Sequence, residues 1–295
     1  MSGPEVAVVT IAHGRREHLA AQHRSLALGS RRPDHYVVVA MDDPSLVPST
    51  DLGLSSTVER IGRADGRLPL AAARNQGVRT AIARGAEVVV LLDVDCLAGE
   101  HLVEAYAEVV AADPWVVWSG PVTYLPPPPA TGYPYHPAHL AGWDDPHRGR
   151  PRPRAGEVVR DLDPDLFWSL SFAVSAPAWD HVGGFCEDYT GYGAEDTDLG
   201  RSVVARGLGL SVTGGARAYH QHHPVSRPPV EHLDDILRNG RTFHARWGFW
   251  PMTGWLEAMA AMGLVRCTGP DWVRVDMDDV DDMVDMDATY EEESA

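Results

Sequence analysis

The chain has 295 residues, with a hydrophobic fraction of 44% and a charged fraction of 23%, which are the proportions of an ordinary globular protein. Its formal net charge of −17 and the lack of a basic stripe argue against nonspecific nucleic-acid binding. Ten acidic residues and no basic residue lie in 276–293, so we expect an acidic disordered tail over 276–295.

The cysteine content and the lengths of the apolar segments bear on the cellular compartment of the protein. Three widely spaced cysteines without a C-x-x-C pair predict neither a disulfide framework nor a cysteine zinc site. The N-terminal segment has no basic region before its apolar run, and no stretch approaches the ~18 apolar residues of a membrane span. We therefore expect a cytoplasmic protein without a membrane span. The Trp-rich segment 247–255 is typical of a core or an interface, which leaves a homo-oligomer open.

The N-terminal part of the chain alternates between β-branched runs and helical patterns. The predicted elements are strands over 5–12, 34–43, 86–95 and 115–125, and helices over 17–28, 68–85 and 101–113. Alternating strands and helices predict an α/β fold with a mostly parallel, Rossmann-like sheet flanked by helices. Such sheets bind ligands at the carboxyl ends of their strands.

The second half of the sequence breaks this alternation. The segment 126–157 is rich in proline and glycine and predicts a long loop. A strand and a short helix follow in 165–185, then a glycine-rich loop entering a helix in 191–207, and a helical C-terminal extension over 230–264. We expect one domain over 1–275, with a nucleotide-binding half over 1–125 and an acceptor-binding half over 126–275.

Two predicted strands end in pairs of acids. Asp42 and Asp43 close the second strand, and Asp93 and Asp95 close the third, where they would project from the same side of an extended chain. Neighbouring carboxylates repel each other, and the nearest basic residue downstream is Arg148. A divalent metal such as Mg²⁺ or Mn²⁺ would relieve the repulsion, and such ions usually accompany a phosphate.

Two later stretches also carry side chains that could bind a metal ion or transfer a proton. AYHQHHP supplies three imidazoles, His220, His222 and His223, any of which could bind a metal ion. An extended backbone would place His220 and His222 on one face. In GYGAEDTD (191–198), three acids follow two glycines, and a carboxylate there could take a proton from a hydroxyl nucleophile. The structural alternatives are a surface histidine loop and an ordinary acidic start of a helix.

The order of these parts resembles that of nucleotide-sugar glycosyltransferases with the GT-A fold, in inverting family two. The stretch G-Y-G-A-E-D-T-D is similar to the W-G-W-G-G-E-D-D-D segment of β-1,4-galactosyltransferases, and the resemblance covers roughly residues 5–225. Ala194 and Thr197 replace a glycine and an aspartate of that segment, and Thr190 stands where it begins with an aromatic residue. These departures leave the donor and the acceptor open.

The resemblance implies a metal-dependent hexosyltransferase that moves a sugar from a UDP-sugar or GDP-sugar to an acceptor hydroxyl with inversion, using Mn²⁺ or Mg²⁺. It implies that Asp196 is the catalytic base and that Glu195 holds the acceptor hydroxyl. The implied metal ligands are Asp95 and His220, with His222 second. The implied acceptor contacts are Trp168, Tyr192 and Gly193. The implied contacts to the nucleotide are Ala12, His13, Arg15, Asp42, Asp43, Arg74, Asn75, Asp93 and Val94.

Other classes of protein are also compatible with the sequence. A sugar nucleotidyltransferase holds metal and nucleotide with similar acids, but it usually has a glycine-rich basic loop after the first strand, and IAHGRREH has one glycine and no lysine. A metal-dependent hydrolase built on HQHH would leave the D-x-D pair unexplained. A non-catalytic sugar-binding module would hold sugar without consuming a nucleotide donor, so turnover of the donor separates it from an enzyme.

Overall fold

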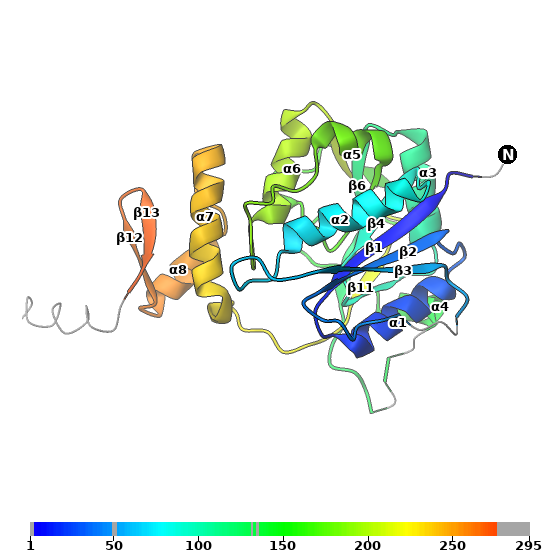
Figure 1. Ribbon diagram of the computed structural model, residues 1–295, viewed down its shortest axis with the longest axis horizontal. Coiled ribbons are helices and arrows are strands. Elements are labelled where there is room, and N and C mark those ends of the chain that lie inside the picture. The colour runs from blue at the N-terminus through cyan, green and yellow to red at the C-terminus, as the bar shows by residue number, and fades with distance from the viewer. Residues whose placement is uncertain (1–2, 49–51, 131, 134–135, 276–295) are drawn as a thin grey trace, which may run out of the picture. The chain divides into compact units, whose positions relative to one another are not determined.

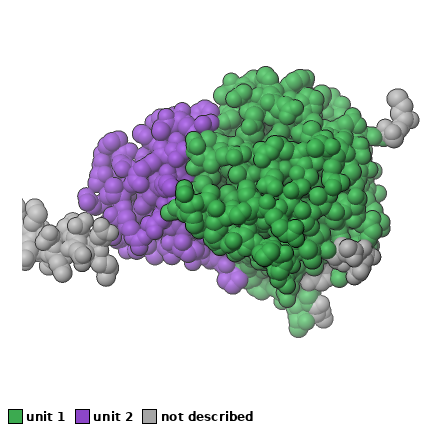
Figure 2. Space-filling view, viewed as in Figure 1, with its two compact units in different colours: residues 1–191, 195–223 green, residues 192–194, 224–295 purple. Residues whose placement is uncertain are grey.

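We analysed a computed structural model of the chain, which describes residues 3–48, 52–130, 132–133 and 136–275. The acidic segment 276–295, for which we expected disorder, lies outside the described residues. The chain divides into two compact units, coloured separately in Figure 2: residues 1–191 with 195–223, and residues 192–194 with 224–295. The single domain over 1–275 and its division at residue 125 stay predictions.

The first unit contains a large sheet, a smaller sheet and the helices that cover them. Its strands are β1 (Val6–Ala12), β2 (His35–Met41), β3 (Ser56–Ile61), β4 (Val88–Leu92), β5 (Cys96–Ala98), β6 (Val116–Ser119), β7 (Val122–Tyr124), β8 (Val158–Val159), β9 (Ser171–Ser175), β10 (Gly209–Thr213) and β11 (Ala218–His220). Its helices are α1 (Arg16–Ala27), α2 (Leu70–Ala83), α3 (Leu102–Ala112), α4 (Pro137–Leu140), α5 (Ala176–Val182) and α6 (Glu195–Ala205), with short 3-10 turns at Ala141–Trp143 and Pro164–Leu166.

The large sheet has eight strands in the order β3-β2-β1-β4-β9-β6-β10-β8. Strands β3, β2, β1 and β4 pair in parallel, as the sequence predicted, and so do β6 and β10. Strand β9 runs antiparallel to both β4 and β6, and β8 runs antiparallel to β10. All seven residues of β1 are buried, as expected for a strand covered on both faces. The fold class predicted from the sequence, a mostly parallel sheet flanked by helices, is confirmed.

Helices cover both faces of this sheet, with α1 on one side of the strands and α2 on the other (Figure 1). Alternate residues of β1 supply the two cores: Val6 and Val8 pack with α1 and α3, and Ala7 and Val9 pack with α2, α5 and α6. Because β1 pairs in parallel with both β2 and β4, the carboxyl ends of these three strands lie along one edge of the sheet. The acids predicted from the sequence follow β2 and β4 at that edge.

Several elements differ from the sequence prediction. The strand expected over 115–125 is two strands, β6 and β7, because the chain leaves the large sheet at Gly120 and Pro121. A Cβ at Gly120 would clash with the carbonyl oxygen of Ala216, so only glycine fits at this crossing. The short strands β3, β5 and β8 were not predicted. The small sheet β5-β11-β7 joins the segment after β4 to the histidine cluster.

The second unit contains the predicted helices and also a hairpin. Its elements are a 3-10 turn (Val230–His232), α7 (Leu233–Trp247), α8 (Thr253–Ala261), β12 (Val265–Thr268) and β13 (Asp271–Arg274). Buried residues of α7, α8 and β12, such as Ile236, Leu256 and Val265, form its own small core. The hairpin is an addition to the helical extension that the sequence predicted.

Close packing of α2 on the sheet predicts the effect of one substitution. A Cβ at Gly77 in α2 would clash with the side chain of Val9 and lie 3.1 Å from Val39. Gly77→Ala should lower the free energy of unfolding by about 1–3 kcal/mol, measured by urea denaturation, because overpacking forces the helix away from the strands. The control is Gly254→Ala in α8, where no atom lies within 4 Å of the new Cβ. That variant should be neutral or more stable by up to about 1 kcal/mol; equal losses in both would contradict the packing argument.

Candidate active site

The two acids of the D-x-D motif lie in a turn between β4 and β5. β4 ends at Leu92, and the N–H of Cys96 donates to the carbonyl oxygen of Asp93 at 2.8 Å. The fully buried Gln22 of α1 donates its side-chain amide to the carbonyl oxygens of Asp93 (2.6 Å) and Cys96 (3.1 Å). The expected common side for Asp93 and Asp95 assumed an extended strand. Because the chain turns there, the two carboxylates meet different partners.

Arg74 joins Asp93 to the acidic segment at the start of α6. Its guanidinium donates to Glu195 Oε1 at 3.0 Å and to Asp93 Oδ1 at 3.1 Å, and its side chain is 6% exposed. Burial opposes the charge of Arg74, but the two carboxylates outweigh it and hold the pKa of the guanidinium above its ordinary value. Burial raises the pKa of Asp93, with Asp95 adding to the effect and Arg74 opposing it. Both terminal nitrogens of Arg74 are thus engaged by protein carboxylates.

Asn75, which the resemblance placed at the nucleotide, ties two parts of the chain together. Its Nδ2 donates to the carbonyl oxygen of Phe185 and to Glu187 Oε1, both at 2.9 Å, and its Oδ1 accepts from the N–H of Phe185 at 2.9 Å. Because donor and acceptor are both used, the structure gives Asn75 a structural role. Its contact to a nucleotide stays a prediction.

Asp95 lies against two imidazoles. Its Oδ2 is 3.4 Å from His220 Nε2 and 3.3 Å from His223 Nε2, and one potential ligand atom from each of these residues falls within 4.8 Å of the others. Burial opposes the charge of Asp95, but the two histidines hold the pKa of its carboxyl below the ordinary value. The second oxygen, Oδ1, is buried without a hydrogen-bond partner among the described residues. A carboxylate and two imidazoles form a donor set that fits a divalent metal ion.

The backbone explains which histidines meet Asp95. His220 is paired with Cys96 in the β5–β11 ladder, and the N–H of Gln221 donates to the carbonyl oxygen of Asp95 at 2.7 Å. His222 was the second candidate ligand, but its backbone N–H donates to the hydroxyl of Tyr133 at 3.1 Å and it is outside the cluster. β11 ends at His220, so the period of two on which the choice of His222 rested does not continue. His223, which the sequence left as an open alternative, lies in the cluster with Asp95 and His220, and metal binding by any of these histidines stays a prediction.

The acids in the first turn of α6 have three different environments. Glu195 is bound by Arg74, and buried Asp198 accepts from the hydroxyl of Tyr189 at 3.1 Å. Asp196 accepts a hydrogen bond from the backbone N–H of Thr197 at 2.8 Å, and no basic side chain among the described residues forms an ion pair with it. Burial, with the neighbouring Glu195, raises the pKa of Asp196 to about 7. A carboxyl with such a pKa can accept a proton at neutral pH.

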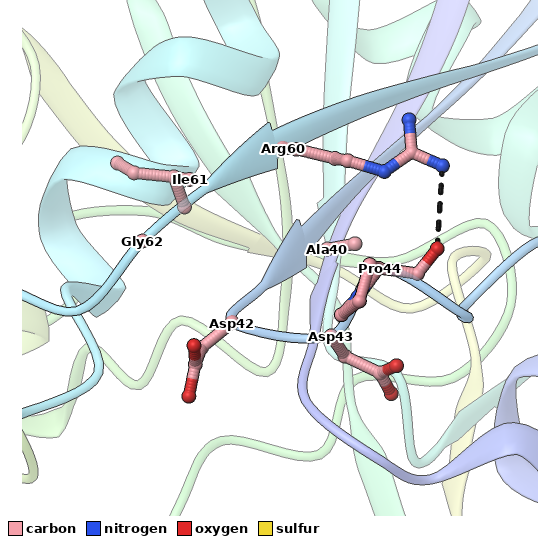
Figure 3. Close-up of a pocket in the computed structure, with 7 residues that line it drawn as sticks. All are labelled: Ala40, Asp42, Asp43, Pro44, Arg60, Ile61 and Gly62. Carbon is pink, nitrogen blue, oxygen red and sulfur yellow. Dashed lines mark hydrogen bonds between the residues drawn. The ribbon is translucent and has the colours of Figure 1, made fainter.

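The acids that follow β2 line a separate pocket of about 230 Å³. Figure 3 shows its seven lining residues, which come from the carboxyl ends of β2 and β3: Ala40, Asp42, Asp43, Pro44, Arg60, Ile61 and Gly62. Asp42 has a left-handed backbone (φ 47°) and its Oδ2 accepts from Arg63 Nε at 2.6 Å. Asp43 accepts from the N–H of Gly14 at 3.2 Å and from Ser45, which lowers the pKa of its carboxyl.

The remaining residues predicted at the nucleotide follow β1 or precede Asp95. Ala12 is buried at the end of β1, and Val94 is buried in the D-x-D turn. His13 Nδ1 lies 2.7 Å from the carbonyl oxygen of Met41 at the end of β2. Arg15 is exposed, with a left-handed backbone (φ 53°), immediately before α1. All four lie near the edge of the sheet where the acids are, and their contacts to a nucleotide stay predictions.

The residues predicted at the acceptor belong to different units. Trp168, in the first unit, contacts His147 with ring centroids 5.1 Å apart, and the guanidinium carbon of Arg150 lies 5.2 Å from its ring. Tyr192 and Gly193 belong to the second unit, where Tyr192 stacks on His232 with ring centroids 4.4 Å apart. Whether they bind an acceptor stays a prediction.

Sequence reasoning missed three residues that the structure places at these sites: Gln22, Arg60 and Arg150. Arg60 has a detectable signal, because S-S-T-V-E-R-I is a β-branched run that fits an edge strand. Gln22 and Arg150 have none, since a lone Gln in a helix and a lone Arg in a Pro-rich loop are usually on the surface.

The fold is that of the GT-A glycosyltransferases. Residues 160–225, which run from before β9 to beyond β11, match a family described as the N-terminal domain of galactosyltransferase. This match includes Asp196 and the histidine cluster.

Two curated relatives have the same name. The chain is 30% identical over 229 residues to a validoxylamine A glucosyltransferase of Streptomyces hygroscopicus subsp. limoneus, an alignment that covers 71% of this chain and 50% of that protein. It is 43% identical over 47 residues to a validoxylamine A glucosyltransferase of Streptomyces hygroscopicus subsp. jinggangensis strain 5008, covering 16% of this chain and 11% of that protein. The chain spans at most about half the length of these relatives.

Solved structures share the fold at low sequence identity. GalNAc-T7 in complex with UDP, GalNAc and Mn²⁺ has a TM-score of 0.52 and 16% identity, covering 75% of this chain and 44% of that one. Residues 1–349 of TarS from S. aureus have a TM-score of 0.51 and 15% identity, covering 81% and 65%. Among the described residues, no helix is both long and apolar enough to cross a membrane.

Proposed function

We propose that the protein is a metal-dependent inverting glycosyltransferase of family two, which moves a sugar from a nucleoside-diphosphate donor to an acceptor hydroxyl. A UDP-sugar is the favoured donor, and a GDP-sugar is the alternative. The observation that carries the proposal is that three acids have different environments. Asp95 lies against two imidazoles, Glu195 is paired with Arg74, and Asp196 has a pKa of about 7. Different environments set carboxyls for different tasks in one site.

Asp196 is the base in this proposal. It takes the proton from the acceptor hydroxyl while the hydroxyl oxygen attacks the anomeric carbon of the donor. The nucleoside diphosphate leaves from the opposite face with the bonding electrons, so the configuration inverts. A pKa of about 7 suits this step, because the carboxylate is available at neutral pH and is still basic enough to accept a proton.

Asp95, His220 and His223 are the proposed metal ligands. Oxygen and imidazole donors together favour Mn²⁺ over Mg²⁺, which prefers oxygens alone, and the buried Oδ1 of Asp95 has a free lone pair for the ion. When bound, the ion supplies Lewis-acid stabilisation of the charge that develops on the departing diphosphate. Asp93 orients this turn through its ion pair with Arg74.

The comparisons support the classes of substrate. The related structure of GalNAc-T7 holds UDP, GalNAc and Mn²⁺, and the curated relatives are named glucosyltransferases. The pocket at Asp42 and Asp43 offers acceptors for hydrogen bonds from a nucleotide base. These observations favour a nucleotide donor and a hydroxyl acceptor.

Thermal melting with UDP or GDP, in the presence and absence of Mn²⁺, tests the proposal. A ligand at about 100 times its Kd adds about 2.7 kcal/mol to the stability of the folded state, which raises the melting temperature by several degrees. We expect this rise for one nucleotide only when Mn²⁺ is present. Asp95→Asn and His223→Ala should abolish it, and His222→Ala, the matched control, should retain it.

Two results would contradict the proposal. If no nucleoside diphosphate stabilises the protein, the transferase assignment is wrong. If UDP stabilises it equally after chelation of divalent ions, the metal assignment is wrong. Consumption of a UDP-sugar in the presence of acceptors then separates an enzyme from a sugar-binding module.

A further inference from the structure

Arg150 is a buried cation that forms no ion pair with any described residue. Its side chain is 9% exposed, and its Nε and one terminal nitrogen are buried without a hydrogen-bond partner among the described residues. Burial lowers the pKa of its guanidinium, which reflects the cost of keeping a charge at this position. A buried charge is normally paired, so an unpaired arginine in an enzyme-like site requires an explanation.

The described side chains in contact with Arg150 are aromatic, and none of them carries a compensating negative charge. The guanidinium lies on the ring of Trp168, and its electrostatic neighbours include Tyr106 and Tyr124. The hydroxyl of Tyr106 is 2.9 Å from Ser171 Oγ, and burial raises the pKa of Tyr106 above its ordinary value, so that phenol is neutral. Contact with an aromatic ring compensates only part of the lost hydration of a cation.

The position of Arg150 connects it with both ends of the proposed site. On one side, Asp196 is among the charges that act on it. On the other side, a row of ring contacts runs from Trp168 through His147 and Tyr124 to His220, with centroid distances of 5.1, 5.7 and 4.7 Å. The cation is therefore near the base and is linked by contacts to a proposed metal ligand.

The backbone holds this part of the loop in place. Pro146 pairs with Thr123 in an antiparallel bridge, and the N–H of His147 donates to the carbonyl oxygen of Val122 at 3.0 Å. The N–H of Arg150 donates to the carbonyl oxygen of His147 at 3.3 Å. Strand β7, which carries Val122 and Thr123, pairs with β11 and thus with His220. Arg150 is held by the same small sheet that positions the histidines.

We propose that Arg150 binds an anionic group of the substrate, either a diphosphate oxygen of the donor or a carboxylate on the transferred sugar. The planar fork of a guanidinium matches both oxyanions, and either one would satisfy the two buried nitrogens. This inference rests on the proposed function and adds a specificity determinant to it. Arg150 would then select the charge of the substrate.

Calorimetric titration in the presence of Mn²⁺ tests the inference, with UDP, UDP-glucose and UDP-glucuronate as ligands. Arg150→Met and Arg150→Gln should weaken the binding of the recognised anion about 10- to 100-fold, as for loss of a hydrogen bond to a charged group. The matched control is Arg148→Met, because Arg148 is exposed two positions away; its affinities should stay within about twofold of the wild type. Weaker binding of UDP itself identifies the diphosphate, and a loss confined to UDP-glucuronate identifies the carboxylate.

The melting temperature of the ligand-free variants gives a second readout. Removing an unpaired buried charge should raise it, whereas removing a structural contact would lower it. Lower melting temperatures in both variants would overturn the inference, as would unchanged affinities for all three ligands. If the wild type binds none of these ligands and no GDP counterpart, the proposed function fails together with the inference; if the wild type binds and the variants bind equally, only the inference fails.

Discussion

Asp196→Asn is expected to lower the rate of sugar transfer by about 10²- to 10⁴-fold, the contribution typical of a positioned general base. The amide cannot accept the proton of the acceptor hydroxyl, but it keeps the shape of the side chain. Binding of the nucleoside diphosphate should stay within about twofold of the wild type, since Asp196 is not a metal ligand in the proposal. Initial rates and calorimetric titration measure the two quantities.

The control is Asp165→Asn, an acid that contacts the same helix from outside. Asp165 forms an exposed ion pair with Arg201 of α6 at 2.6 Å, so its loss should change the rate less than about twofold. A reduction of less than about tenfold for Asp196→Asn would contradict its role as the base.

The pH dependence follows from the same pKa. The base acts when it is deprotonated, so kcat/KM of the wild type should fall about tenfold per pH unit below pH 7 and be level above it. The folded-state pKa of about 7 is above the ordinary value of an aspartate, so the contribution of this group to stability is present at low pH and lost as pH rises through about 7. Asp196→Asn should therefore raise the melting temperature more at pH 8 than at pH 5.

Arg74→Met is expected to lower the free energy of unfolding by about 3–5 kcal/mol, because it leaves two carboxylates in a buried site without their cation. Arg74 is 6% exposed, and its partner Glu195 is 8% exposed, so little solvent screens the pair. Urea denaturation at pH 7 measures the loss.

Two further variants make this prediction specific. Arg79→Met removes an arginine from the same helix, but that side chain is 65% exposed and 3.7 Å from Glu187, so its loss should be at most about 1 kcal/mol. Arg74→Met combined with Glu195→Gln should be more stable than Arg74→Met alone, because one uncompensated charge is removed. Equal losses in the free energy of unfolding for Arg74→Met and Arg79→Met would show that the buried ion pairs of Arg74 stabilise the protein no more than the exposed pair of Arg79.

Local sequence patterns predicted much of the sheet and placed the acids at its edge. Continuous apolar runs such as 88–92 must be covered on both faces, and helical patterns between them supply the cover, so parallel strands follow. β3 was missed because S-T-V-E-R-I carries two charges, which an edge strand tolerates and a central strand does not.

The sequence predicted the contacts between side chains much less well. Nothing near Arg74 indicates that its partner Glu195 lies 121 positions later in the chain, and the resemblance suggested a contact to the nucleotide instead. The choice between His222 and His223 depends on where β11 ends, which its pairing with β5 decides. A period of two is informative only within a strand.

The sequence by itself determined the α/β class, the strand ends that carry acids, and the chemistry available in D-V-D, G-Y-G-A-E-D-T-D and H-Q-H-H, because these depend on local periodicity and residue type. Only the tertiary structure decided that Asp93 and Asp95 have different partners, that His223 joins His220, and that Arg150 is buried without an ion-pair partner among the described residues. These features depend on contacts between segments far apart in the chain and on exclusion of water, and neither leaves a local pattern in the sequence.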